Sequence, residues 1–230
     1  MSTDAPTPES RIVLLVNPNT NQATTAMMSG LAAAELAATD LEVVGISAAH
    51  GPRMLIDPDS LRRSEEHVAA AVREFLAGPA GPRVAAVVVA AIGDPGRAAL
   101  DRQLPVPVVG IGQASILAAA LDGRPYAMAT STPLLAPSLA ELVEATGRPD
   151  HFLGIELTES GPLELAADQE AQFQELRSAV ARAADAGAKA VIIAGGPLSE
   201  TARRLAGEGL AEIIEPIPSA CRLVRNLLAG

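Results

Sequence analysis

The sequence predicts an α/β protein with two pseudo-symmetric lobes, each with a central parallel sheet flanked by helices, and an active-site cleft between them. Short runs of mostly β-branched residues alternate with alanine-rich stretches, a pattern typical of βαβ units. Apolar residues make up 49% of the chain and aromatic residues only 2%, so small aliphatic side chains must form the core. Two distant segments, 86–96 and 190–198, repeat one plan of buried strand, small-residue turn and helix start.

Six short aliphatic runs have the composition of buried strands, and amphipathic stretches separate them. We expect strands at 11–16, 41–46, 84–90, 106–111, 125–130 and 189–193. We expect helices at 20–38, 60–76, 113–121, 133–146, 168–186, 199–206 and 219–228. Because strands alternate with helices, crossover connections should make both sheets parallel.

Glycine-containing segments at 110–113 and 207–211 are the predicted crossings between the lobes. The first lobe is then residues 11–112 plus 211–230, and the second is residues 113–210. Residues 1–10 are rich in Pro, Thr and Ser and lack the basic and apolar regions of a signal peptide, which predicts a disordered leader.

Composition excludes several classes of function. The net charge is −10 and Lys and Arg do not cluster, so neither nucleic acid nor a membrane is an expected partner. A single cysteine excludes an internal disulfide. The histidine spacing predicts no metal site, and the glycine-rich turns match neither a phosphate loop nor a dinucleotide fingerprint, so no cofactor is expected. We expect a cytoplasmic protein with a small-molecule substrate, and homo-oligomerisation stays open.

Five motifs in order resemble one family over nearly the whole chain. They are the loop 17–20 (Asn-Pro-Asn-Thr), the segment 50–52 (His-Gly-Pro), the turn 93–96 (Gly-Asp-Pro-Gly), the strand 107–111 and the loop 130–132 (Thr-Ser-Thr). The sequence resembles the aspartate/glutamate/hydantoin racemase family, especially its hydantoin racemase branch. The resemblance implies a duplicated α/β fold with a central cleft.

The family's usual chemistry is missing from this sequence. In that family the two matching turns each deliver a catalytic cysteine, and the two thiols exchange protons on opposite faces of a carbon. The matching positions here are Ala91 and Gly195, neither of which can transfer a proton. Cys221 lies at the start of the last predicted helix, where the resemblance gives no catalytic role, and we expect it to be a small buried apolar residue.

Polar loops at the carboxyl ends of parallel strands predict two facing cradles for a carboxylate or cyclic imide. The structural alternative is that Asn17 and Thr20 only cap a turn and a helix, and that Thr132 is only an N-cap. The predicted substrate-binding residues are Asn17, Asn19, Thr20, Gly51, Pro52, Ala91, Gly93, Thr130, Ser131, Thr132, Gly195, Gly196, Pro197 and Leu198.

Two ionisable residues are the predicted catalytic groups, His50 and Asp94. The resemblance places His50 at the cleft, and histidine titrates near neutral pH. The alternatives are that His50 is merely exposed and that Asp94 is an N-cap carboxylate. Tyr126 could be a buried phenol or a donor in the cleft.

The predicted function is therefore an enzyme of the racemase fold with thiol-independent, cofactor-free chemistry. The reaction would be isomerisation, cyclisation or a lyase or decarboxylation step on a small carboxylate, cyclic imide or enolisable metabolite. The alternatives are a non-catalytic relative that binds small molecules and an amino acid or hydantoin racemase whose cysteines were mutated.

Overall fold

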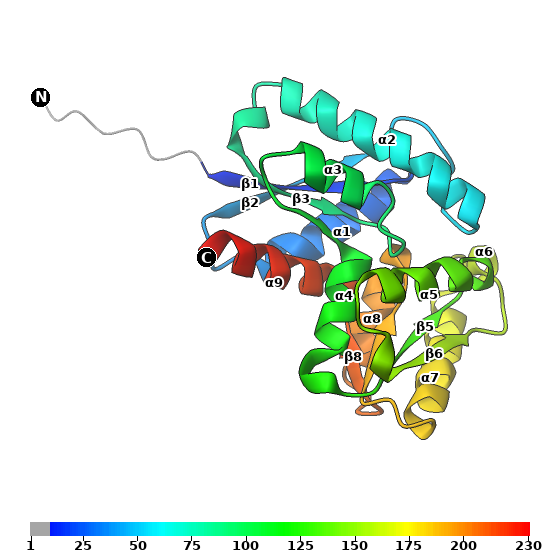
Figure 1. Ribbon diagram of the computed structural model, residues 1–230. Helices are drawn as coiled ribbons and strands as arrows, with labels where there is room; N and C mark the ends of the chain where they lie inside the picture. Colours follow the sequence, from blue (N-terminus) through cyan, green and yellow to red (C-terminus); the bar gives the residue numbers. More distant parts are fainter. Residues whose placement is uncertain (1–9) are drawn as a thin grey trace, which may run out of the picture.

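The computed structural model describes residues 10–230, and most of the predicted leader lies outside these residues. Two parallel sheets of four strands each form two lobes, in the orders β2-β1-β3-β4 and β6-β5-β7-β8 (Figure 1). Helices flank both sheets, so the predicted α/β class with two similar lobes is confirmed. The central strands β1 and β3 correspond in position to β5 and β7.

The first sheet contains β1 (Arg11–Asn17), β2 (Leu41–Ser47), β3 (Val84–Val89) and β4 (Val108–Gly110), with α1 (Gln22–Glu35), α2 (Pro58–Ala77), η1 (Gly81–Arg83), α3 (Arg97–Gln103) and α9 (Pro216–Ala229) around it. Alternate strand residues point to opposite faces. Val13 and Leu15 of β1 pack in the cluster with α1 and α9, whereas Leu14 and Val16 pack in the cluster with α2 and α3. Both faces are thus covered, which explains the nearly continuous apolar runs.

The second sheet contains β5 (Tyr126–Thr130), β6 (Phe152–Leu157), β7 (Ala190–Ile193) and β8 (Glu212–Ile214), with α4 (Ile111–Ala119), η2 (Leu121–Gly123), η3 (Pro133–Leu135), α5 (Ala136–Ala145), η4 (Pro149–His151), α6 (Pro162–Leu165), α7 (Gln169–Asp185), η5 (Gly196–Leu198) and α8 (Ser199–Leu205) around it. Helices α7 and α8 share one apolar cluster with this sheet, and α4 and α5 share the other. No helix in residues 10–230 is long and apolar enough to cross a membrane.

Strands β6 and β8 were not predicted, and both lie at the edges of the second sheet. Strand β6 is half exposed and includes Gly154 and Glu156, so it lacks a continuous apolar run. Strand β8 has only three residues and pairs with β7. The chain therefore returns to the first lobe with α9, after β8, and not at residue 211 as the sequence suggested.

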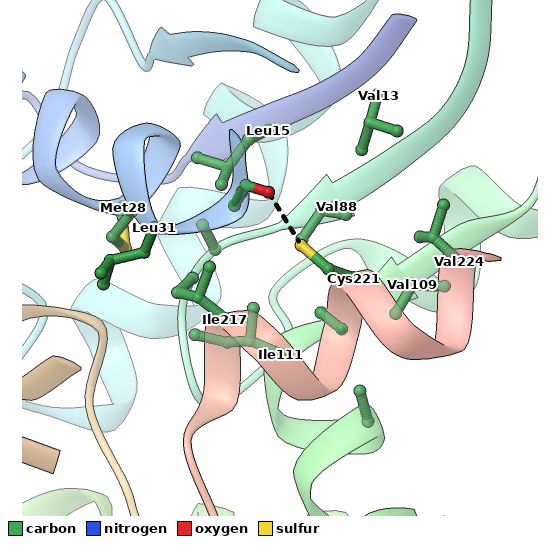
Figure 2. Close-up of a cluster of buried hydrophobic side chains, with 14 of the residues drawn as sticks. Val13, Leu15, Met28, Leu31, Val88, Val109, Ile111, Ile217, Cys221 and Val224 are labelled. Atoms are coloured by element: carbon green, nitrogen blue, oxygen red, sulfur yellow. Dashed lines mark hydrogen bonds between the residues drawn. The ribbon is translucent and has the colours of Figure 1, made fainter. Parts of the chain in front are cut away.

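Cys221 is a buried apolar residue of α9, as predicted. Its side chain lies among Val13, Val88, Val109 and other aliphatic residues between α9 and the first sheet (Figure 2). It is 1% exposed, and its sulfur lies 4.0 Å from the carbonyl oxygen of Ala32. Burial raises the pKa of the Cys221 thiol to about 12, so this thiol stays protonated and unreactive at neutral pH.

Candidate active site

The turns that follow β3 and β7 meet at one cavity of about 60 Å³ between the lobes. Both Ala91 and Gly195 line it, as the duplicated segments require. Other predicted binding residues also line it: Asn17, Asn19, Gly93, Thr130, Ser131, Thr132, Gly196, Pro197 and Leu198. The cavity adjoins a wider surface hollow, since the two share Thr24, Met54, Ala166, Gln172 and Pro197.

The predicted residues Thr20, Gly51 and Pro52 are not among the residues that line the cavity. The backbone N–H of Thr20 donates to the carbonyl oxygen of Pro52 at 3.1 Å, and its hydroxyl donates to the same oxygen at 3.3 Å. These bonds join the loop after β1 to the loop after β2. That second loop contributes Met54 and Leu55 to the cavity wall instead.

His50 lies away from this cavity, in a separate surface hollow beside β2 and α2. Its ring centroid is 6.5 Å from that of His67, and Glu74 and Phe75 line the same hollow. The family resemblance placed His50 at the cleft, because His50 immediately precedes Gly51 and Pro52. The loop instead turns so that residues four and five positions later reach the cavity.

Asp94 also does not line the cavity, although it follows three residues that do. Its carboxylate accepts the backbone N–H groups of Gly112 at 2.8 Å and Gln113 at 2.6 Å, in the first turn of α4. Asp94 is therefore not the N-cap residue of a helix, although its carboxylate binds the first turn of α4, whose N-cap residue is Gly110. The helix that follows Asp94 directly, α3, has Gly96 at its N-cap and no side-chain cap bond.

The first predicted cradle is held together by its own hydrogen bonds. The Asn17 amide donates to Asn19 Oδ1 at 3.0 Å and to Thr25 Oγ1 at 2.9 Å, and its Oδ1 accepts the Asn19 N–H at 3.2 Å. Asn19 Oδ1 in turn accepts the N–H of Asn21 at 2.9 Å. Asn17 and Asn19 therefore shape the loop, and their polar atoms are largely occupied.

Replacing Asn17 by alanine should lower the free energy of unfolding by about 1–3 kcal/mol, because buried partners on Asn19 and Thr25 lose their bonds. Urea denaturation followed by circular dichroism measures this loss. Asn226→Ala is the matched control, because Asn226 is exposed on α9 and should change stability by less than about 0.5 kcal/mol. Equal stability of the two variants would contradict the structural role of Asn17.

The second predicted cradle connects the lobe's two central strands. The Thr130 hydroxyl donates to the carbonyl oxygen of Ala194 at 2.8 Å and lies 2.9 Å from the Thr132 hydroxyl. Thr132 occupies the N-cap position of η3, but its side chain makes no cap bond there. Within the described residues, neither the hydroxyl nor the backbone N–H of Ser131 has a hydrogen-bond partner, although the residue is buried.

A row of backbone donors lies in the turn after β3, and its residues line the cavity. The N–H groups of Ala91, Ile92 and Gly93 donate to no acceptor in the described part of the chain. Consecutive unpaired N–H groups form a concave site for negative charge. All three residues line the cavity, so the row can serve an anionic or carbonyl oxygen of a ligand there.

The rest of the cavity wall is apolar except for Thr24 and Gln172, and no ionisable side chain lines the cavity. Its wall includes Met28, Met54, Leu55, Leu61, Ile92, Leu135 and Leu198. Tyr126 is a buried phenol, not a cleft donor, since its hydroxyl donates to the carbonyl oxygen of Arg148 at 2.7 Å. Within residues 10–230, no three His, Cys, Asp or Glu side chains come together to hold a metal ion.

Sequence reasoning missed most of this apolar wall, although it included Leu198. Met28, Leu61 and Leu135 lie on elements whose apolar residues also fill the cores, so periodicity does not distinguish them. Gln172 was missed as well. It lines the cavity from α7, and its Oε1 accepts the Thr201 hydroxyl at 2.6 Å.

Three comparisons with known proteins agree with this architecture. The Asp/Glu/Hydantoin racemase family model matches residues 13–224. The chain is 27% identical to a hydantoin racemase of Paenarthrobacter aurescens over 218 residues, which cover 94% of this chain and 91% of the relative.

The solved structure of an allantoin racemase from Klebsiella pneumoniae superposes with a TM-score of 0.86 at 23% identity, covering 96% of this chain and 88% of that chain. An arylmalonate decarboxylase structure superposes with a TM-score of 0.59 at 15% identity, covering 95% and 93% of the two chains. These likenesses concern the fold. The family match extends over both lobes, and the chain belongs to the Asp/Glu/hydantoin racemase family.

Proposed function

We propose that this protein is an enzyme that uses the racemase fold for cofactor-free, thiol-independent chemistry on a small carboxylate, cyclic imide or other enolisable metabolite. The observation that carries the proposal is the lining of the cavity. It combines unpaired N–H groups at Ala91, Ile92, Gly93 and Ser131 with apolar side chains, and it contains no side chain that can exchange a proton. Such a site can stabilise a developing oxyanion but cannot remove a Cα proton.

Among isomerisation, cyclisation and lyase chemistry, this lining favours decarboxylation of a substrate whose α-carbon bears both a carboxylate and a second carbonyl group. The C–C bond to the carboxylate breaks, CO2 leaves, and the electron pair moves onto the carbonyl oxygen to form an enolate. The row of N–H groups at 91–93 would hold that oxygen, while the apolar wall favours release of a charged carboxylate as neutral CO2. The enolate carbon then takes a proton from water.

The geometry at Gly195 argues against a racemase that recently lost a thiol there. A Cβ on Gly195 would lie 3.0 Å from Cγ and Cδ1 of Leu198, closer than ordinary van der Waals contact. Leu198 must shift by a few tenths of an ångström to admit any side chain. The cavity wall at this position therefore has room for a glycine but not for a larger side chain unless Leu198 moves. This supports the view that Gly195 is native and does not replace a cysteine that was mutated.

The test is a substrate panel in D2O, followed by NMR, with substituted malonates, hydantoins and cyclic imides. We expect a substituted malonate to lose CO2 and to gain one deuterium at the α-carbon that carried the lost carboxylate, and we expect no Cα exchange of a hydantoin. The paired variant Ala91→Cys with Gly195→Cys is the comparison, and trace Cα exchange is expected only there. Cα exchange by the unmodified protein that survives Cys221→Ser would contradict the proposal, and binding without turnover would favour a non-catalytic relative.

A further inference from the structure

Asp94 is held in a backbone conformation that most residues avoid. Its φ angle is +50°, and in the described residues only one other non-glycine residue, Asp122, has a positive φ. Such a conformation costs about 1–3 kcal/mol and persists only where the surroundings impose it. The residue is only 7% exposed, so a strained backbone here accompanies a carboxylate in the protein interior.

The surroundings of this carboxylate are fitted to it. Its two oxygens accept the N–H groups of Gly112 and Gln113 at 2.8 and 2.6 Å. A Cβ on Gly110 would lie 2.0 Å from its Cγ, and a Cβ on Gly112 would lie 3.1 Å from its Oδ2. The Asp94 carboxylate is therefore surrounded by Gly110, Gly112 and Gln113, about eighteen residues later in the sequence. The glycines leave space for it, and Gly112 and Gln113 donate hydrogen bonds to it.

Helix α4, whose first turn binds the Asp94 carboxylate, contacts elements of both lobes. Helix α4 begins directly after β4 of the first sheet, and it packs against α9 on one side and against α5, β7 and β8 of the second lobe. The turn that contains the donor row ends at Asp94, whose own N–H donates to the carbonyl oxygen of Ala91 at 2.9 Å. The carboxylate thus joins the donor row to the helix between the lobes.

We infer that Asp94 is a positioning residue whose carboxylate, by binding the first turn of α4, holds the N–H groups of Ala91, Ile92 and Gly93 toward the cavity. It acts through the turn and does not touch the ligand. The chemical use of the donor row rests on the proposed function. The position of the row can be tested without any turnover.

A cysteine introduced at position 91, the first residue of the donor row, can be used to test where the N–H groups of the row lie. In an Ala91→Cys variant, nearby N–H groups should stabilise the thiolate and lower its pKa below the ordinary value of about 8.5. The rate of reaction with a thiol reagent as a function of pH gives that pKa. Cys221 stays silent because it is buried and its thiol pKa is about 12.

Adding Asp94→Asn to Ala91→Cys should raise the pKa of the introduced thiol by about one pH unit, which is about tenfold less thiolate at a fixed pH below it. Asparagine keeps the size and tolerates a positive φ, but its NH2 group faces one of the two backbone donors. Mere loss of the negative charge of Asp94 would instead lower the thiol pKa. A lowered or unchanged pKa would therefore overturn the inference.

Asp122→Asn in the same Ala91→Cys background is the matched control. Asp122 has a φ of +56°, is exposed in η2 and does not line the cavity, so the thiol pKa should not move.

If Asp94→Asn does not fold, hydrogen exchange of the unmodified protein tests the inference instead. The amides of Gly112 and Gln113 should be protected, and exchange as fast as in an open loop would contradict the inference. Lack of turnover in the substrate panel would refute the proposed function and leave both measurements valid.

Discussion

Replacing Gly110 by alanine should destabilise the protein by about 3–6 kcal/mol, the sum of overpacking and lost hydrogen bonds to a buried carboxylate. The new Cβ would lie 2.0 Å from Asp94 Cγ. Asp94 cannot move aside without breaking its bonds to Gly112 and Gln113. The loss would be a large part of the 5–15 kcal/mol that is typical of a domain. Urea denaturation measures it.

Gly30→Ala is the control for this prediction. Gly30 lies inside α1, and a Cβ there would meet nothing within 4 Å, so alanine should stabilise the protein by about 0.5–1 kcal/mol. Adding Asp94→Gly to Gly110→Ala should recover part of the lost stability, because glycine removes the clashing carboxylate and accepts the positive φ. Equal stability of Gly110→Ala and Gly30→Ala would show that this contact does not constrain the fold.

The free energy of unfolding should fall as the pH rises from about 4 to about 7, because of Asp94. Burial raises the pKa of this carboxyl to about 7, while the N–H groups of Gln113 and Gly112 and the charge of Arg97 oppose the rise. The folded protein therefore binds the proton more tightly than the unfolded chain does, whose aspartate pKa is about 3.9. The contribution is complete below pH 4 and decreases by up to about 1.4 kcal/mol per pH unit until the pH passes 7.

Chemical denaturation between pH 5.5 and 8 tests this dependence. Asp94→Asn, which cannot titrate, should flatten the pH dependence of the unfolding free energy in this range. Asp122→Asn should leave the dependence unchanged, since Asp122 is exposed. A dependence of equal slope in the unmodified protein and in Asp94→Asn would assign it to other groups.

Much of the architecture could be predicted because it depends on local periodicity. The six aliphatic runs became β1 to β5 and β7. Most of these strands are buried and need apolar residues throughout, whereas β2 is an edge strand that is only partly buried. Strands β6 and β8 were not predicted because β6 contains Gly154 and Glu156 and β8 has only three residues, so neither has a recognisable apolar run. The core role of Cys221 was also predictable, because a lone thiol in an amphipathic helix packs as a small apolar group.

The candidate site was predictable only in part. The turns with Ala91 and Gly195 were recognisable because a repeated strand and turn in a duplicated fold lead to one cleft. The roles of single polar residues were not, since a motif does not specify which way its side chains point. Thr20 and Pro52 bind each other, and His50 lies in a different hollow.

By itself the sequence determined the two α/β lobes, the family resemblance and the absence of thiols at Ala91 and Gly195, because strand periodicity and residue identity are properties of the chain. Only the tertiary structure decided that Asp94 binds the first turn of α4 and that residues 91–93 line a cavity without ionisable side chains. The physical reason is distance along the chain. A hydrogen bond or a cavity wall depends on where remote segments meet, and the packing of the two lobes alone brings them together.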